Sequence, residues 1–326
     1  MRPVPGRLLY LSKSDVQAVG ITMPEIIDVL DRAFREKGEG RVEMPPKPGI
    51  HTQPDAFIHA MPAWIPSLGA AGCKWVSGYP ANQDLGLPYI NGLLILNDPE
   101  TGLPLSVMDC TWITAMRTGA ATAVAAKYLA RPDSQVVGIL GCGVQGRSNL
   151  EALRVLFSVQ RVVAYDVRRE SLKRFAAEVG ARQDVEVVQA QEPMEAVAES
   201  DLVVTAGPIL HTPHATIKAG WLPKGAFASL VDYDSYWSRA ALHEADKFCT
   251  DDLPQLELYR SMGYFQNIPP IYAELGEIVA GKKPGRERPD ERILACNLGI
   301  AMDDMATAII IYQRALAAGI GTWLPL

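Results

Sequence analysis

The feature that most constrains this chain is a glycine-rich turn placed near its middle. An apolar run at 136–140 leads into Gly141-Cys-Gly-Val-Gln-Gly146, and a helical pattern follows over 148–157. A second apolar run ends at Asp166, 20 residues after Gly146. Strand, G-x-G-x-x-G turn, helix, strand and acid together form the fingerprint of a dinucleotide-binding unit. The sequence therefore predicts a dinucleotide whose pyrophosphate lies at the helix N-terminus.

Short apolar runs alternate with helical patterns beyond this motif. Strands are expected at 136–140, 161–166, 185–189, 201–206, 226–231, 247–250 and 293–296. Later helices are expected around 255–262 and 271–279. This alternation predicts a doubly wound parallel sheet, the Rossmann arrangement.

About 130 residues precede the motif and have to form something else. From 56 to 107 the apolar runs are short and separated by turns, which predicts an antiparallel or mixed sheet. Helices are expected over 23–34 and 114–129, and we expect the last helix, 302–318, to return to this first part. The predicted fold class is α/β, with a Rossmann domain at 128–301 inserted in a discontinuous α+β domain formed by 1–127 with 302–326.

Composition excludes several other classes of protein. The chain of 326 residues carries a net charge of −6 and shows no basic stripe, so we expect no nucleic-acid partner. No apolar run approaches the ~20 residues of a membrane span, and the first six residues lack the apolar core of a secretory leader. The five widely spaced cysteines indicate a reduced, cytoplasmic protein. His211 and His214 flank Pro213 without further nearby ligands, so we expect no metal site.

Several motifs, in this order, resemble those of the ornithine cyclodeaminase/mu-crystallin family. They are Met61-Pro62, Lys74-Trp-Val76, Pro80-Ala-Asn82, Leu96-Asn-Asp98, Thr101-Gly102, Thr114-Ala-Met-Arg117-Thr-Gly-Ala-Ala, Gly141–Gly146, Gly276-Glu-Ile-Val-Ala-Gly281 and Gly299-Ile-Ala-Met-Asp-Asp304. The resemblance covers nearly the whole chain. It implies a substrate-binding and dimerisation domain made from both chain ends, and hence a homodimer.

The resemblance also assigns roles to charged residues of the first domain. Lys74 and Arg117 match family cations that bind the substrate carboxylate, and two cations suit one planar anion. Lys47 stands where the family has a third cation, an arginine, so the charge remains but the fork geometry is lost. His59, also a candidate substrate-binding residue, aligns with a glutamate of the cyclodeaminases, which weakens the case for a diamino substrate.

A proton carrier is expected after the strand at 226–231. Asp234 matches the family aspartate that handles the amine or imine proton during hydride transfer, with Lys74 as the other catalytic residue. The context departs from the family, because Asp232 stands where glycine is common and could compete for this role. Tyr236 and Trp237 follow, and we expect them to shape a bulkier pocket wall.

The cofactor is expected to be NAD, with NADP possible. Asp166 should bind the ribose hydroxyls and repel a 2′-phosphate, whereas Arg168 and Arg169 could neutralise one. The residues predicted to bind the cofactor are Arg117, Thr118, Gly141, Gly143, Val144, Gln145, Gly146, Asp166, Val167, Arg168, Thr205, Ala206, Val231, Asp234 and Leu298.

Three functions remain open at this point. The main one is an NAD(P)-dependent oxidoreductase that interconverts a small amino acid and its imino or 2-oxo acid. The second is a cyclodeaminase, which needs an acid near the side-chain amine; Asp232 or Asp55 could replace the missing glutamate. The third is a ligand-binding protein like the mu-crystallins, against which the joint presence of Lys74, Arg117 and Asp234 argues.

Overall fold

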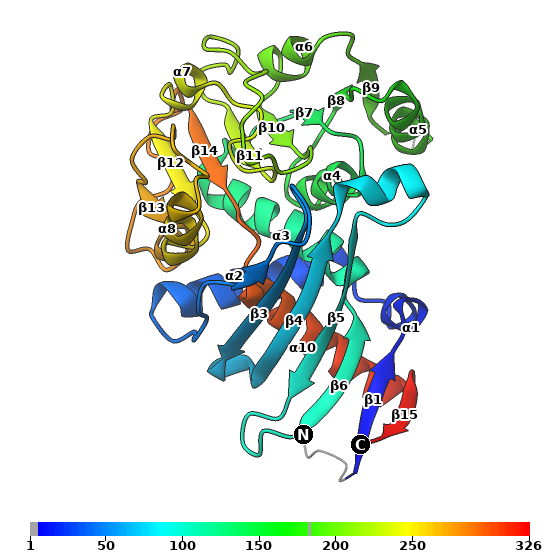
Figure 1. Ribbon diagram of the computed structural model, residues 1–326. Coiled ribbons are helices and arrows are strands. Elements are labelled where there is room, and N and C mark those ends of the chain that lie inside the picture. The colour runs from blue at the N-terminus through cyan, green and yellow to red at the C-terminus, as the bar shows by residue number, and fades with distance from the viewer. Residues whose placement is uncertain (1–5, 182–183) are drawn as a thin grey trace. The chain divides into compact units, whose positions relative to one another are not determined.

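The computed structural model describes residues 6–181 and 184–326, and the chain divides into two compact units. Unit 1 contains residues up to Arg117 together with Ile300–Leu326, and unit 2 is Thr118–Gly299. Both sheets and their helices can be followed in Figure 1. Residues 1–5, on which the expectation of no secretory leader partly depends, lie outside the described residues.

Unit 1 is built on a mixed seven-stranded sheet of order β15-β1-β6-β5-β4-β3-β2. Its strands are β1 (Arg7–Leu11), β2 (Gly49–Ile50), β3 (Phe57–Ile65), β4 (Ala70–Gly78), β5 (Ile90–Asn97), β6 (Pro104–Asp109) and β15 (Thr322–Pro325). The short 3₁₀ helices η1 (Pro66–Leu68) and η2 (Pro80–Leu85) precede β4 and β5. Among the described strands of this sheet, β1 and β6 pair in parallel and the other neighbours pair antiparallel.

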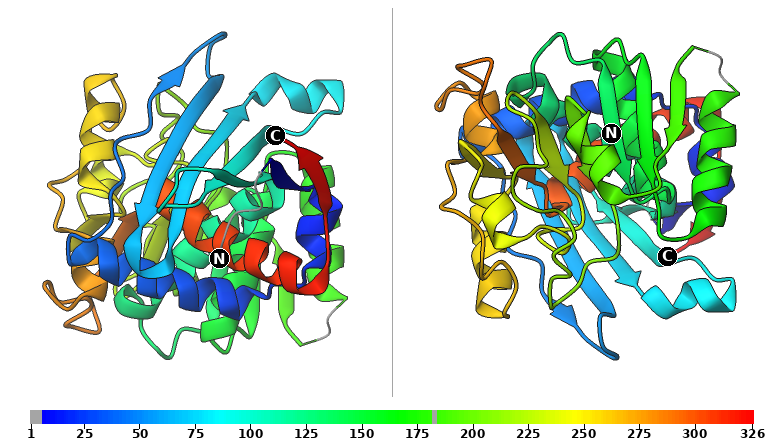
Figure 2. Two further views of the ribbon diagram at one scale, coloured as in Figure 1. Left: turned by 90° about the horizontal axis from the view of Figure 1, so that it is seen from below. Right: turned by 90° about the horizontal axis from the view of Figure 1, so that it is seen from above.

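Helices cover one face of this sheet. They are α1 (Lys13–Ala18), α2 (Met23–Gly38) and α10 (Ala301–Ala318). Helix α10 packs on β3, β4 and α2, and Figure 2 shows these helices on the same side of the strands. Side chains alternate across a strand, so Met61 and Lys74 face the helices, whereas Trp64 and Trp75 point to the opposite, exposed face. The covered face therefore contains the core of unit 1.

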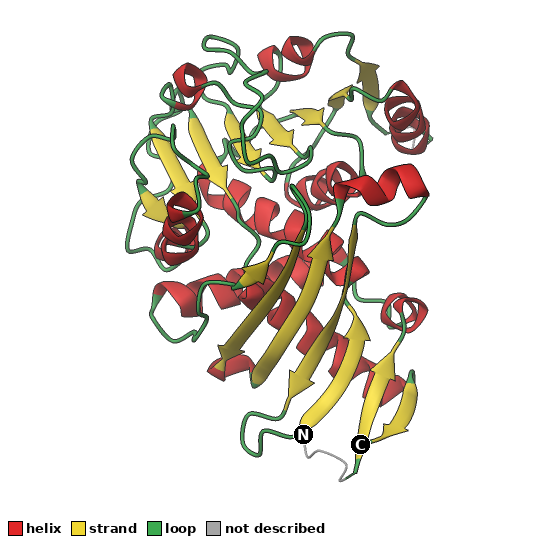
Figure 3. Cartoon of the chain, in the orientation of Figure 1, coloured by secondary structure: helices red, strands yellow, loops and turns green. Residues whose placement is uncertain are grey.

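Unit 2 has an eight-stranded parallel sheet of order β13-β12-β14-β11-β10-β7-β8-β9. Its strands are β7 (Val136–Leu140), β8 (Arg161–Tyr165), β9 (Glu186–Gln189), β10 (Leu202–Thr205), β11 (Phe227–Leu230), β12 (Lys247–Thr250), β13 (Ala273–Glu274) and β14 (Ile293–Cys296). The helices are α3 (Thr111–Leu129), which begins in unit 1, then α4 (Val144–Leu156), α5 (Arg169–Gly180), α6 (Pro193–Ala198), α7 (Arg239–Leu242), α8 (Leu253–Ser261) and α9 (Leu275–Val279). Figure 3 distinguishes them from the strands.

Helices lie on both faces of this parallel sheet. A Cβ at Gly138 of β7 would meet the carbonyl of Ala196 in α6, whereas a Cβ at Gly146 of α4 would lie 3.1 Å from the side chain of the next residue, Ile139. Because neighbouring residues of a strand face opposite ways, α6 and α4 cover opposite faces. The strand order reverses between β7 and β10, where ligands bind in doubly wound sheets. The predicted fold class is confirmed.

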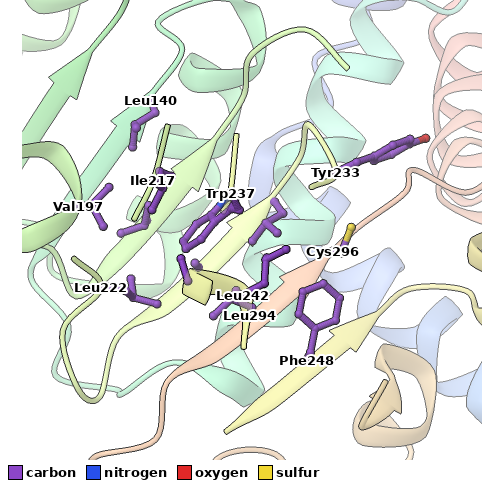
Figure 4. Packing of buried hydrophobic residues seen from close by; sticks show 14 of the residues in the cluster. Leu140, Val197, Ile217, Leu222, Tyr233, Trp237, Leu242, Phe248, Leu294 and Cys296 are labelled. Carbon is purple, nitrogen blue, oxygen red and sulfur yellow. The ribbon is translucent and has the colours of Figure 1, made fainter. Parts of the chain in front are cut away.

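Buried apolar side chains join the strands of unit 2 to their flanking segments. Trp237 and Leu294 lie in one cluster with Leu140, Ile217 and Phe248 (Figure 4). Trp237 is almost completely buried, and its Nε1 donates to Thr205 Oγ1 at 3.4 Å. The expectation that Trp237 forms a pocket wall is wrong, because its ring fills the core instead.

Two elements differ from the sequence-based expectation. The sequence pattern predicts a helix over 271–279, but β13 occupies Ala273–Glu274 and pairs in parallel with β12, so α9 begins only at Leu275. Glu274 ends the strand and also caps α9 through a capping box with Glu277. The C-terminal strand β15 was not expected; it pairs antiparallel with β1.

Candidate functional site

Lys74 is a buried cation in the interior of the unit 1 sheet. Its side chain is 1% exposed, and β4 has neighbours on both sides. Its Nζ lies 2.6 Å from Asp304 Oδ2 and donates to Thr114 Oγ1 at 3.4 Å. An ammonium has three N–H donors, so these two partners leave one donor for a ligand. Burial lowers the pKa of Lys74, and Asp304 opposes that shift.

Arg117 lies on α3 beside the same carboxylate. Its Nε donates to Asp304 Oδ1 at 3.1 Å, and its Nη1 lies 3.7 Å from Asp303 Oδ2. Both aspartates are completely buried in the first turn of α10. Lys74 and Arg117, which are 43 positions apart in the numbering, thus share one anionic partner. The structure brings together the two cations that the resemblance assigns to carboxylate binding.

Lys47 and His59 lie at the neighbouring edge of this cluster. Lys47 comes just before Pro48, whose carbonyl accepts a hydrogen bond from Ala60 of β3. His59 pairs in register with Val76 of β4, two residues from Lys74, and stacks on Phe57 with ring centroids 4.2 Å apart. Burial, Lys47 and other nearby cations lower the pKa of His59 to about 3. His59 is therefore a neutral side chain near pH 7.

The glycine turn of unit 2 has the close contacts that a dinucleotide site requires. Gly141 has φ +103°, and a Cβ there would lie 2.5 Å from the carbonyl oxygen of Ala206 after β10. A Cβ at Gly146 would lie 2.2 Å from the carbonyl oxygen of Gly141. Gly143 is the N-cap of α4, so no capping side chain blocks the N–H groups of that helix. Gly141 and Gly146 let strand, turn and helix pack closely, and the residues present fit a dinucleotide pyrophosphate.

Asp166 directly follows β8, which ends one residue earlier than expected, at Tyr165. Its Oδ2 accepts from the backbone N–H of Cys142 at 2.8 Å, and its Oδ1 accepts from the N–H of Arg168 at 2.7 Å. The carboxylate is thereby fixed beside the glycine turn, where ribose hydroxyls bind in such folds. Arg168 and Arg169 are exposed and lie directly after it.

The structure separates the surroundings of Asp232 and Asp234. Asp232 Oδ1 accepts from Thr205 Oγ1 at 2.6 Å, and its Oδ2 accepts from Gly207 N–H at 2.9 Å. Burial raises the pKa of Asp232 to about 7, although both hydrogen bonds oppose this. Asp234 Oδ1 is buried and has no hydrogen-bond partner among the described residues. Burial also raises the pKa of Asp234.

The backbone between these aspartates is strained. Tyr233 has φ +63°, a conformation that bulky residues rarely adopt. Its buried ring packs against Tyr259 and Phe265, with centroid distances of 5.4 and 5.0 Å, and its hydroxyl donates to Leu298 O at 3.4 Å. These contacts stabilise a turn that would otherwise cost about 1–3 kcal/mol. Asp234 therefore projects from a turn that the aromatic cluster holds in place.

The other predicted cofactor residues occupy varied surroundings in unit 2. Val144 and Val167 are exposed beside the glycine turn and Asp166, and Val167 is 82% exposed. Thr205 is buried, and its hydroxyl serves Asp232, so only its backbone is available to a ligand. Gln145 lies in the first turn of α4, and Thr118 lies in α3. Val231 directly follows β11, and Leu298 lies shortly after the end of β14. Their contacts with a cofactor stay predictions.

Sequence reasoning assigned no role to Asp303, Asp304 or Thr114. The structure shows that all three contact or lie near Lys74 or Arg117. Two adjacent acids in a helix that is otherwise largely apolar were a signal, because buried carboxylates need cationic partners. Within residues 6–181 and 184–326, no three His, Cys, Asp or Glu side chains are grouped to hold a metal. No helix in that part of the chain has the length and apolar character to cross a membrane.

These features define a class of protein. A doubly wound sheet with a glycine turn at its switch point is a dinucleotide-binding fold, and unit 1 carries buried cations suited to an anionic ligand. A profile of the ornithine cyclodeaminase/mu-crystallin family matches residues 9–319, and the chain belongs to that family.

Several known proteins are similar to this chain over almost its whole length. Alanine dehydrogenase from Archaeoglobus fulgidus is 36% identical over 323 residues, which cover 96% of this chain and 97% of that protein. The structure of Thermococcus litoralis Δ1-pyrroline-2-carboxylate reductase in complex with NADH and L-proline has a TM-score of 0.88, with 35% identity, covering 97% of this chain and 99% of that one. An archaeal alanine dehydrogenase dimer with bound NAD has a TM-score of 0.86, with 36% identity, covering 98% and 99%.

Proposed function

We propose that this protein is an NAD-dependent oxidoreductase that interconverts a small α-amino acid and its imino or 2-oxo acid. The observation that carries the proposal is the buried pair Lys74 and Arg117, with an N–H donor of Lys74 left for a ligand. Buried cations are costly unless anions pair with them, and besides Asp304 the pair can receive one further anion through that donor. An α-carboxylate is the anion common to amino and imino acids.

Each unit contributes a different part of the proposed reaction. Lys74 and Arg117, with Lys47, bind and orient the substrate carboxylate. The glycine turn and Asp166 would hold the cofactor. When bound, the cofactor would accept a hydride from Cα in the oxidative direction or donate one to Cα in the reductive direction. Asp234 takes the amine proton in the oxidative direction and returns it in the reductive direction. Asp232 is a structural residue in this scheme, since both its oxygens already accept hydrogen bonds.

NAD is favoured over NADP by Asp166. Its carboxylate is held by two backbone N–H groups and repels a 2′-phosphate. Relatives bound to NADH and NAD support this choice.

The alternative of a cyclodeaminase is less well supported. That reaction needs an acid near the side-chain amine, and His59 is a neutral residue whose pKa is lowered to about 3. Asp55 is exposed in a turn before β3, and Asp232 is hydrogen-bonded to Thr205 and Gly207. These surroundings do not favour either aspartate as the acid that a diamino substrate needs. A mu-crystallin-like binding role would leave the buried proton carrier Asp234 without a use.

We also propose that the protein is a homodimer through the exposed face of the unit 1 sheet. Pro62, Cys73, Ile95, Val107 and Tyr10 are successive cross-strand neighbours on that face. Trp64, Trp75 and Leu93 extend the patch and are exposed. A contiguous apolar face of this kind marks a protein interface, and one similar structure is a dimer. The cytoplasmic location of the protein stays a prediction.

A panel assay tests the proposed reaction. Purified protein is mixed with NAD⁺ or NADP⁺ and single amino acids, and separately with NADH or NADPH and 2-oxo acids plus ammonia or methylamine. Absorbance at about 340 nm follows the nicotinamide, and released ammonia is measured in parallel. Net conversion of NAD⁺ or NADH with one substrate class is expected. Ammonia release from a diamino acid without net NADH would establish the cyclodeaminase, and tight ligand binding without turnover would establish the binding role.

A further inference from the structure

One carboxylate on α10 joins the two cations assigned to the substrate. Asp304 Oδ2 lies 2.6 Å from Lys74 Nζ, and Asp304 Oδ1 accepts from Arg117 Nε at 3.1 Å. Lys74 lies on β4, Arg117 in the part of α3 that belongs to unit 1, and Asp304 on α10, so three separate elements meet at this group. The Asp304 side chain is 0% exposed, and water therefore does not screen these contacts.

The two oxygens of Asp304 each serve a different cation. A carboxylate has a fixed distance between its oxygens, so this arrangement limits how far apart Lys74 Nζ and Arg117 Nε can lie. Without such a bridge, two like charges in a buried site repel each other. The neighbouring Asp303 lies farther away, with its Oδ2 3.7 Å from Arg117 Nη1. Asp304 is thus the residue that couples both cations.

We propose that Asp304 is a positioning residue that holds Lys74 and Arg117 at the separation needed to receive the substrate carboxylate. The inference rests on the proposed function, because it assumes that these cations bind substrate. Asp304 acts through the two cations and does not itself touch the substrate. It also helps to keep Lys74 protonated. The other groups around that ammonium are Arg117 and Thr114 of α3, Cys110 just before α3, and His59 on β3. Of these, Arg117 acts against Asp304, because its positive charge lowers the pKa of Lys74.

The test is Asp304→Asn, assayed with the substrate that the panel identifies. We expect kcat/KM to fall about 100-fold, mainly through a higher KM, since displaced binding groups cost that much. The dissociation constant for NADH, measured by its fluorescence, should change far less than KM, because the glycine turn and Asp166 of unit 2 hold the cofactor. The alkaline limb of the kcat/KM profile should move to lower pH, because Lys74 loses the anion that raises its pKa. An unchanged or lower KM would overturn the proposal and show that Asp304 only competes with substrate.

Two further variants separate positioning from folding. Asp98→Asn removes another buried carboxylate of unit 1, which accepts from Thr101 and Glu100 and does not contact Lys74 or Arg117. It should lower the thermal midpoint without changing KM or the pH profile. Asp304→Glu keeps the charge but moves it, so KM should rise while the alkaline limb stays in place. If Asp304→Asn does not fold, Asp304→Glu decides, and an unchanged KM there overturns the proposal.

The failure of the proposed function looks different from the failure of this inference. Wild-type protein that turns over no amino or imino acid refutes the proposed function, and the positioning role with it. Wild-type turnover that Asp304→Asn leaves intact refutes the positioning role alone.

Discussion

The Nζ atom of Lys74 lies 2.6 Å from Oδ2 of Asp304, and both side chains are almost completely buried. The two residues come from β4 and α10, elements far apart in the chain that pack directly on each other. Helix α10 brings its acids to the covered face of the sheet. The positions of the side chains in the carboxylate site therefore depend on the packing of α10 against β4.

Replacing Lys74 with Met should impair both binding and stability. The carboxylate of Asp304 loses one of two cationic partners, and removing one partner of a buried pair costs about 3–5 kcal/mol. Loss of a charge-assisted hydrogen bond to substrate, about 1.5–3 kcal/mol, should lower kcat/KM roughly 10- to 100-fold. Denaturant unfolding and steady-state kinetics measure these effects. The exposed Lys173→Met is the control, and it should change neither quantity.

Asp234→Asn should abolish most turnover while the cofactor still binds. Loss of a general acid–base group typically costs about 10²- to 10⁴-fold in rate. Asp232→Asn should instead destabilise the loop after β10, because an amide nitrogen cannot accept the hydrogen bond from Thr205 or from Gly207. Its unfolding free energy should fall by about 1–3 kcal/mol, with measurable turnover remaining. If Asp232→Asn abolishes turnover and Asp234→Asn does not, the proton carrier is Asp232.

The pH profile should depend on the direction of the reaction. Burial raises the pKa of Asp234, so its carboxylate becomes protonated at a higher pH than an ordinary aspartate. Oxidation needs the carboxylate, and kcat/KM for the amino acid should fall as pH drops through that raised pKa. Reduction needs the protonated form, and kcat/KM for the imine should fall as pH rises through it. Profiles measured in both directions on one preparation check this, and a limb that survives in Asp234→Asn belongs to another group.

Asp166→Ser should weaken the preference for NAD. The variant loses the carboxylate that repels a 2′-phosphate and binds ribose, while Arg168 and Arg169 remain. Loss of hydrogen bonds to a charged group, about 1.5–3 kcal/mol, predicts roughly 10- to 100-fold weaker NADH binding, with little loss for NADPH. Fluorescence titration with both cofactors measures the ratio. The charge-conserving Asp166→Glu should keep the discrimination against NADPH.

Ile95→Glu should produce monomers. Ile95 lies in the row of apolar residues across the exposed face of the sheet and is 39% exposed. A charge there would be buried without a partner in the proposed dimer, which costs several kcal/mol. Light scattering at micromolar concentration gives the mass. Val155→Glu on α4 of unit 2 is a control with the same exposed fraction, and it should remain dimeric. A monomeric wild-type protein would contradict the dimer.

The sequence by itself determined the elements whose signals are local. The glycine turn, Asp166 and the strands of unit 2 could be predicted because backbone strain at Gly141 and alternating apolar runs act over a few residues. The family resemblance assigned Lys74 and Arg117 to carboxylate binding, but it did not show which residues hold their side chains in position. Only the tertiary structure decided that Asp304, 187 residues beyond Arg117, is their shared partner. It also placed Trp237 in the core, gave Asp232 two hydrogen bonds and left Asp234 Oδ1 without one. These outcomes depend on which distant segments pack together, and no short window of sequence contains that information.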